Sequence, residues 1–312
     1  MNQVIEQVKH LRDVERLTQR AIAKESGVTE SILSSLLKGT YLGQSDVYEK
    51  KLALWVESKK ESKAALKEAS NELLSEPEFL MLPTAKQIMG LMGVAQSLKS
   101  WSMVYEGAGV GKTMAAKEYQ RTHNNVWIVT ASAFCKTASF VLGELAEQLG
   151  IKSQGMTIAR LSKAIAKELD GTNGLVVIDE AQYLSDDVLN GLRILIDGKA
   201  GGMLLGNDVV RTRMTTTRSK INMKAFWSRV ISPANVKHSS AEDIAMFVRA
   251  WGINDESMIK YALKVTPKTE GQLRSLSAII KLAASTAKSK GQNISAQHLA
   301  IAHDYLTESL RG

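Results

Sequence analysis

A glycine-rich turn between an apolar run and a helical run is the feature that most restricts how this chain can fold. Residues 102–105 (SMVY) suit a buried strand, residues 106–112 read EGAGVGK, and a helix is expected from Thr113. Glycines permit the backbone angles that point consecutive N–H groups at one anion, and a helix N-terminus adds further unpaired N–H groups. A strand, a tight turn and a helix in this order predict a parallel α/β unit that binds phosphate at the turn.

The spacing of this turn predicts roles for its residues. A triphosphate-binding loop has the pattern G-x-x-x-x-G-K-[ST], and this chain departs from it at the first position, which is Glu106. Either the next glycine takes over that first role or the first turn is distorted. Lys112 is expected to reach the β- and γ-phosphates of ATP, and Thr113 to ligate Mg²⁺. The residues expected to surround the phosphates are Gly107, Ala108, Gly109, Val110 and Gly111.

A second motif, LVVIDE at residues 175–180, lies 66 residues after Thr113. Four apolar residues suit a strand that is buried on both faces of a parallel sheet, and ligands of such sheets bind at the strand carboxyl ends. Asp179 is expected to hold Mg²⁺, and Glu180 to orient and polarise the attacking water. The two motifs together predict Mg²⁺-dependent binding and hydrolysis of ATP.

Apolar and helical runs alternate through the middle of the chain, which predicts a parallel sheet with helices on both faces. The expected strands are 102–105, 126–130, 175–178, 203–205 and 230–231, and the expected helices are 113–121, 139–150, 159–169 and 185–196. We predict four segments: a helix-turn-helix domain at 1–58, a polar helical linker at 59–82, the α/β core at 83–233, and an all-α region at 234–312.

The helix-turn-helix prediction rests on residues 19–38, QRAIAKESGVTESILSSLLK. Ala23 allows the two helices to cross closely, Gly27 allows the turn, and Thr29 can cap the second helix. The exposed face of that second helix is short and carries little positive charge. A module that docks proteins therefore remains the alternative to a module that reads DNA.

The positive charge of the chain is concentrated in one stretch. Residues 199–237 hold eight basic residues and one acid, Asp208, so they carry +7 of the net charge of +8. A local basic cluster is typical of a surface that contacts the phosphates of nucleic acid. The candidate DNA-binding residues in it are Arg211, Arg213, Arg218, Lys220 and Lys224.

Composition excludes several other classes of protein. One cysteine, Cys135, cannot form a disulfide framework, and it favours a reducing compartment such as the cytoplasm. We find no apolar run of about 18 residues, so no membrane span or membrane partner is expected.

These motifs resemble those of the AAA+ ATPases. The resemblance implies that Asn207, after the strand at 203–205, is a polar sensor near the γ-phosphate. It implies that Arg229 in FWSRV reaches the ATP of a neighbouring subunit, with Arg211, Arg213 and Arg218 as alternatives. Arg274 in EGQLRSL corresponds to the second sensor of a helical lid.

Over its whole length the chain also resembles the family of the phage Mu B transposition protein, through GVGKT, NNVW, GLVVIDEA and LLGN. The chain departs from that family at Glu106 and at residues 159–170, where the family helix is richer in arginine and this chain offers Lys163 and Lys167 for DNA binding. The resemblance implies an ATPase that forms helical filaments on double-stranded DNA. It further implies target capture for a Mu A-like transposase that stimulates hydrolysis, in the host cytoplasm if a phage encodes the chain.

Two other classes of function stay open. A transcription regulator would use residues 19–38 to read an operator and the ATPase as a switch. An ATPase that assembles other proteins, such as a helicase loader or a secretion ATPase, would respond little to bare DNA.

Overall fold

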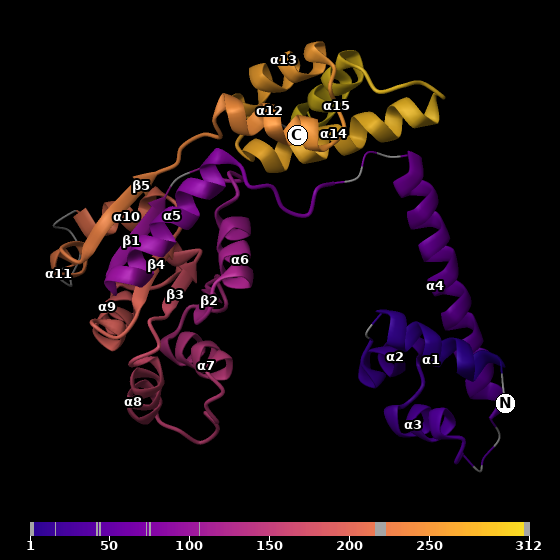
Figure 1. The fold of residues 1–312 in the computed structure, drawn as a ribbon, viewed down its shortest axis with the longest axis horizontal. Helices are drawn as coiled ribbons and strands as arrows, with labels where there is room; N and C mark the ends of the chain where they lie inside the picture. Colours follow the sequence, from indigo (N-terminus) through magenta and orange to yellow (C-terminus); the bar gives the residue numbers. More distant parts are fainter. Residues whose placement is uncertain are drawn as a thin grey trace. The chain divides into compact units, whose positions relative to one another are not determined.

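The computed structural model describes residues 3–15, 17–41, 43, 45–72, 74, 76–105, 107–215 and 223–308 (Figure 1). The chain divides into two compact units, Met1–Leu73 and Leu74–Gly312.

The first unit is helical, with α1 at Gln3–Glu15, α2 at Gln19–Ser26, α3 at Glu30–Lys38 and α4 at Asp46–Glu72. Its core is built on the fully buried side chains of Val8, Ile22, Leu33 and Leu52. Gly27 ends α2 at φ +65°, in the left-handed region that glycine adopts readily. Helix α4 runs through residue 58, so this helix has no break at the predicted start of the linker.

The cap that the sequence predicts for α3, the second helix of the predicted helix-turn-helix, is not formed. Thr29 occupies the N-cap position of α3, but its side chain makes no capping hydrogen bond. Its Oγ1 instead lies 3.4 Å from Oγ of Ser31. The cap of α2 is formed as its sequence allows, because the Thr18 side chain accepts a hydrogen bond from the Ala21 N–H.

The second unit contains a five-stranded sheet of order β2-β3-β4-β1-β5, whose recorded strand pairs are all parallel. The strands are β1 at Trp101–Tyr105, β2 at Val126–Thr130, β3 at Leu175–Asp179, β4 at Gly201–Leu205 and β5 at Val230–Asn235. The parallel sheet expected from the sequence is therefore confirmed. Strand β5 extends beyond the predicted 230–231 and includes Pro233, which an edge strand tolerates.

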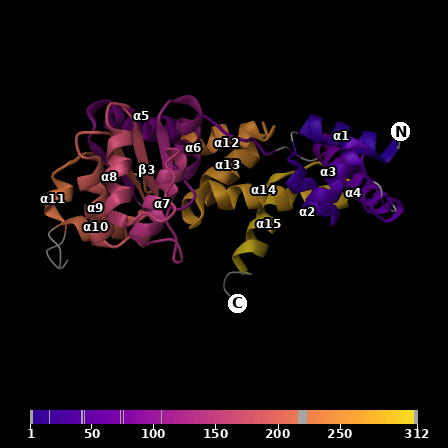
Figure 2. The same ribbon diagram turned by 90° about the horizontal axis from the view of Figure 1, so that it is seen from below.

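Helices cover both faces of this sheet (Figure 2). On one face, α5 (Pro83–Leu98) and α6 (Lys112–Thr122) pack in a cluster with β1, β3 and β4. On the other face, a second cluster contains α7 (Ala138–Gln148), α8 (Ile158–Leu169), α9 (Asp186–Ile196) and α10 (Asp208–Thr215). The short helix α11 (Lys224–Trp227) precedes β5 and buries Phe226 against Trp101. A parallel sheet requires this double cover because both of its faces are apolar.

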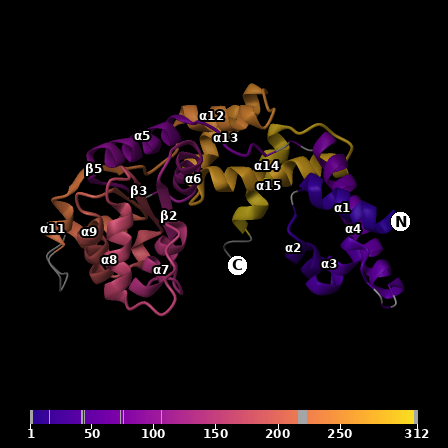
Figure 3. The ribbon, with the colours of Figure 1, turned by 60° about the horizontal axis from the view of Figure 1, so that its bottom comes forward.

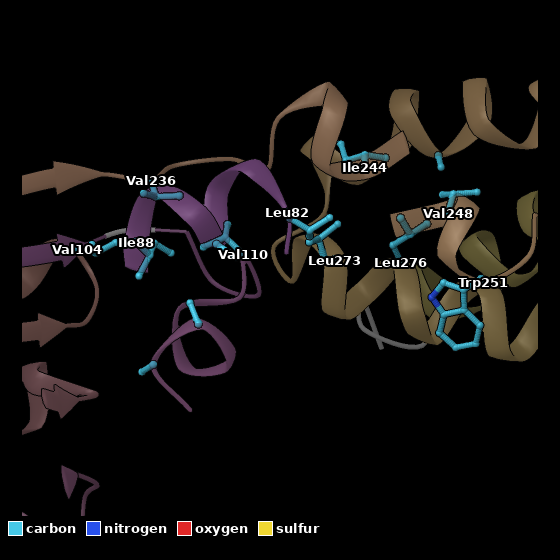
Figure 4. Packing of buried hydrophobic residues seen from close by; sticks show 14 of the residues in the cluster. Leu82, Ile88, Val104, Val110, Val236, Ile244, Val248, Trp251, Leu273 and Leu276 are labelled. Carbon is cyan, nitrogen blue, oxygen red and sulfur yellow. The ribbon is translucent and has the colours of Figure 1, made fainter. Parts of the chain in front are cut away.

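The sequence predicts an all-α region at 234–312. From residue 241 the described chain is helical, with α12 at Ala241–Ala250, α13 at Glu256–Val265, α14 at Gln272–Ser289 and α15 at Ala296–Glu308 (Figure 3). These helices share one apolar cluster with the α5 side of the sheet, in which Leu82 and Val110 join Leu273 (Figure 4). A shared core fixes α14 beside the glycine-rich loop. None of the helices in the described ranges is long and apolar enough to cross a membrane.

Candidate nucleotide-binding site

The glycine-rich loop leaves the carboxyl end of β1 and leads into α6. Gly107, Gly109 and Gly111 all adopt positive φ, at +49°, +71° and +96°. A Cβ on Gly107 would lie 2.1 Å from the carbonyl oxygen of Val236, so glycine alone fits this position. Glu106, where the motif departs from its pattern, lies outside the described residues.

Lys112 is the first residue of α6, and its Nζ donates a hydrogen bond to the Gly107 carbonyl at 2.7 Å. The lysine therefore folds back over the loop. Burial lowers the pKa of Lys112, while the carboxylates of Glu180 and Asp179 oppose that shift. An ammonium that is partly removed from water gains strongly from an anion brought beside it.

Thr113 and Asp179, from α6 and β3, meet directly. The Thr113 hydroxyl donates to Asp179 Oδ2 at 2.7 Å, and Asp179 is 3% exposed. Burial is the largest cause that raises the pKa of Asp179, although two hydrogen bonds oppose it. A hydroxyl oxygen beside a buried carboxylate suits Mg²⁺, which prefers oxygen ligands and would compensate the buried charge. The two residues expected to hold this ion therefore fit it.

Glu180 follows β3 at φ +54°, and its side chain is exposed. Its carboxylate accepts a hydrogen bond from Nε2 of Gln182. Oε1 of the same glutamine accepts from the Asn207 N–H at 3.4 Å. Gln182 thus links the carboxylate of the predicted water-activating residue to the main chain of the predicted sensor, and the sequence alone predicts no role for Gln182. The one sequence feature that could have indicated such a contact is a polar residue two positions after Glu180, just beyond a buried strand.

The side chain of Asn207 has a local partner as well. Its Oδ1 accepts a hydrogen bond from the Val209 N–H at 3.1 Å, which caps the start of α10. Asn207 lies after β4, whose neighbours in the sheet are β3 and β1, so it is near the same edge as the two motifs.

Arg274 lies at the loop, on the first turn of α14. A Cβ placed on Gly109 would be 1.8 Å from the Gly271 carbonyl oxygen and 3.3 Å from Cβ of Arg274. The charge of Arg274 contributes to the lowered pKa of Lys112. The structure therefore brings the predicted second sensor to the predicted phosphate site within a single chain.

Arg229 lies at the end of the sheet where β1 begins, opposite the end that carries the glycine-rich loop. Its carbonyl accepts a hydrogen bond from the N–H of Trp101, the first residue of β1, whereas the glycine-rich loop follows the last residue of that strand. The Arg229 side chain donates to Asp197 Oδ2 and to the Ala225 carbonyl, each at 3.0 Å. It does not reach the loop of its own chain.

The basic cluster has partners within the chain. Arg211 lies 5.3 Å from the ring centroid of Tyr105 and 3.8 Å from Asp208, and its side chain is 45% exposed. Arg213 is paired with Asp186 and donates to the Gln182 carbonyl at 3.3 Å.

The other DNA-binding candidates divide into two groups. Three of them are exposed, namely Lys224 on α11 and the pair Lys163 and Lys167 on α8. Arg218 and Lys220 lie outside the described residues.

Comparisons with known proteins agree with this architecture. Residues 99–213 match the AAA domain family, and residues 228–306 match the family described as Mu B transposition protein, C terminal. The crystal structure of Cdc6p from Pyrobaculum aerophilum aligns with a TM-score of 0.54 at 14% identity, over 73% of this chain and 68% of that one. Together with the parallel sheet, the AAA domain match establishes the AAA+ fold expected from the sequence.

Two relatives match at higher identity. The "ATP-dependent target DNA activator B" of Escherichia phage D108 is 33% identical, over 97% of this chain and 93% of the relative. The "Mu-like prophage FluMu DNA transposition protein B" of Haemophilus influenzae is 35% identical, over 86% of this chain and 91% of the relative. Since both matches span nearly complete chains, the chain belongs to the Mu B transposition protein family.

Proposed function

We propose that this chain is a Mg²⁺-dependent ATPase that binds double-stranded DNA in its ATP-bound state and presents that DNA to a transposase. The observation that carries the proposal is the meeting of Thr113 with the buried Asp179, beside Lys112 at a glycine-rich loop. Two relatives bear the words "target DNA activator B" and "DNA transposition protein B" in their names, which supports the assignment to transposition.

Each residue of the site has a part in hydrolysis. Lys112 leaves the Gly107 carbonyl to contact the β- and γ-phosphates, whose charge outweighs that of a neutral carbonyl oxygen. Thr113 and Asp179 hold Mg²⁺, which neutralises charge on the phosphate oxygens when bound. Glu180 accepts a proton from the attacking water, and Arg274 contacts the γ-phosphate from α14.

The position of Arg229 supports assembly into a filament. An arginine that cannot reach its own ATP is free to reach the ATP of a second copy, after its exposed ion pair with Asp197 opens. Exposed ion pairs contribute only about 0–1 kcal/mol, so this opening costs little. ATP then adds a contact between copies, and assembly depends on the nucleotide. Lys224, Arg211 and their neighbours line up along the phosphate backbone, with Lys163 and Lys167 as further contacts.

The proposed domains of the chain follow the order of its helices and strands. Helices α2 and α3 form a helix-turn-helix in a domain at 1–58, followed by a linker at 59–82. The core spans 83–233, and α12 to α15 form a lid within 234–312. The proposed place of action is the cytoplasm, which is that of the host cell if a phage encodes the chain.

Electron microscopy with random-sequence linear DNA tests this function. We expect filaments with a non-hydrolysable ATP analogue and none without nucleotide. A footprint confined to one sequence would instead indicate a transcription regulator. An ATPase rate that does not respond to DNA, without filaments, would indicate an ATPase that assembles other proteins.

A further inference from the structure

The turn that follows β2 carries the most exposed large apolar side chain among the described residues. Phe134 is 95% exposed, whereas the next such side chain, Leu54, is 67% exposed. Single exposed apolar residues are common on protein surfaces, so exposure alone assigns no role to Phe134. The rigidity of this turn, its position and the charge around it indicate what the ring contacts.

Hydrogen bonds close the turn tightly. The N–H of Ser132 donates to the Cys135 carbonyl and the N–H of Cys135 donates to the Ser132 carbonyl, both at 3.1 Å. The Cys135 N–H also lies 3.2 Å from Ser132 Oγ. Helix α7 begins shortly afterwards, and the Thr137 side chain caps it by accepting from the Phe140 N–H. Phe134 is therefore held at the tip of an ordered turn, so little conformational entropy is lost when its ring binds a partner.

The turn lies beside the predicted Mg²⁺ site. Strands β2 and β3 pair in parallel, with Thr130 opposite Asp179. The next residue, Ala131, donates its N–H to the Asp179 carbonyl at 2.9 Å. The turn that carries Phe134 therefore leaves the sheet at its carboxyl edge, one strand away from the predicted ligand of the ion.

The surface beside the turn is basic. Lys136 is exposed two residues after Phe134, and Ala138, the first residue of α7, lines the same groove as Lys163 of α8. Residues 149–167 contain four basic residues and no acidic residue. The four, all exposed, are Lys152, Arg160, Lys163 and Lys167. None of them forms an ion pair within the part of the chain that the structure describes. Unpaired cations attract the phosphates of a duplex, which brings base pairs to an apolar ring placed among them.

We infer that Phe134 contacts DNA by inserting its ring partly between neighbouring base pairs of a duplex, while Lys136 contacts a phosphate. The inference rests on the proposed function, because it adds a contact to the same ATP-dependent binding of DNA. The contact lies outside the basic stretch at 199–237. Apolar side chains that enter a base step unstack it partially, and a phenyl ring can stack on the face of any base. The contact should therefore depend little on sequence.

Insertion of the ring has a cost and a gain. The cost is the partial unstacking of one base step, which is smallest at flexible pyrimidine–purine steps. The gain is the removal of an exposed phenyl ring from water and its contact with the faces of the bases. Because the two effects oppose each other, we expect the ring to tighten DNA binding by only about tenfold, equal to about 1.4 kcal/mol.

The first measurement is the DNA affinity of the full chain with a non-hydrolysable ATP analogue, by fluorescence anisotropy with a random-sequence duplex. Phe134→Ala should bind about tenfold more weakly than the parent, with an unchanged dependence on salt concentration. Lys136→Ala should reduce the slope of log K against log salt by about 1. Phe134→Leu keeps an apolar wedge and should stay within about threefold of the parent.

The matched control for these variants is Leu98→Ala. It removes an apolar side chain that is 65% exposed, three residues before the start of β1 and so near the opposite end of the sheet. Its DNA affinity should equal that of the parent. Because Phe134 is almost fully exposed, Phe134→Ala should also unfold in urea at the same concentration as the parent, which separates a lost contact from misfolding.

A duplex that contains 2-aminopurine measures insertion directly, because this base fluoresces more strongly when it leaves the stack. The parent should raise its fluorescence with the ATP analogue, and Phe134→Ala should not. An unchanged DNA affinity in Phe134→Ala, or no rise in fluorescence with the parent, overturns the inference. If Phe134→Ala instead loses filaments while the fluorescence still rises, the ring contacts a second copy of the chain and the inference is also wrong.

Lys112→Ala distinguishes the two levels of failure. If the DNA affinity of the parent does not depend on ATP, the proposed function fails, and the inference fails with it. If ATP tightens DNA binding by the parent but not by Lys112→Ala, while Phe134→Ala matches the parent, only the insertion of the ring is wrong.

Discussion

Replacing Gly109 by alanine tests the contact between the glycine-rich loop and the C-terminal helices. Gly109 adopts φ +71°, and an added Cβ would lie 1.8 Å from the carbonyl oxygen of Gly271. Real Cβ contacts are essentially never shorter than 3.0 Å, so the two backbones would have to separate by about 1.2 Å. Neither partner is a flexible side chain, and the displacement must be taken up by the loop or by the start of α14.

Two contributions to the free energy of unfolding can be estimated. Left-handed backbone in a residue with a Cβ costs about 1–2 kcal/mol. Overpacking of a close contact costs about 1–3 kcal/mol more. We therefore expect Gly109→Ala to lower the stability of the nucleotide-free protein by about 2–5 kcal/mol. Gly111→Ala provides the control, because Gly111 has φ +96° and no atom within 4 Å of its added Cβ. The stability of the Gly111→Ala variant should fall only by the backbone cost of about 1–2 kcal/mol.

Urea unfolding without nucleotide, followed by tryptophan fluorescence, measures these differences. Trp101 and Trp251 are both buried in the second unit and report on it. A further control is Gly191→Ala, in the middle of α9 with open space around it, which should gain about 0.5–1 kcal/mol. If Gly109→Ala and Gly111→Ala lose the same stability within about 0.5 kcal/mol, the close approach of Gly109 to Gly271 is refuted.

Two further substitutions test the electrostatics of the second unit. Asp243→Ala should cost about 3 kcal/mol in urea unfolding, because this fully buried carboxylate accepts from the N–H groups of Thr84 and Ser240 and from the Thr84 hydroxyl. A loss under about 1 kcal/mol would show that it does not join α5 to α12. Asp179→Asn should raise the melting temperature of the protein at pH 7–8 without nucleotide or Mg²⁺, because burial raises the pKa of Asp179 above 3.8 and so penalises its charged form. The gain should shrink as the pH falls through the raised pKa of the folded state, and a gain that grows instead would contradict this sign.

Much of the α/β core could be predicted from the sequence because its signals are local. The run LVVID has the composition of a strand that is buried on both faces, and β3 is buried along its whole length. The glycines of the loop precede a helix, and their spacing requires positive φ in this setting. The predicted β5 was too short, because the residues of this edge strand alternate between partly buried and exposed positions and Pro233 argues against a strand.

Contacts between distant residues could not be predicted in this way. The basic stretch carries +7 in the sequence, yet Arg213 is paired with Asp186, 27 residues away, and Arg229 with Asp197, 32 residues away. Counting charges along the chain therefore overlooks the ion pairs that both arginines form with distant acids. The approach of Gly271 to Gly109 likewise depends on how α14 packs, which no local pattern encodes.

In the proposed function, ATP bound at the glycine-rich loop controls DNA binding, and the DNA affinity of the Lys112→Ala variant measures this control. Fluorescence anisotropy with a random-sequence duplex should show that ATP and Mg²⁺ tighten binding by the parent at least about tenfold, a difference of about 1.4 kcal/mol. Lys112→Ala should retain the weak nucleotide-free affinity and gain nothing from ATP. If the variant binds DNA as tightly as the parent in the presence of ATP, the nucleotide does not control DNA binding through this loop.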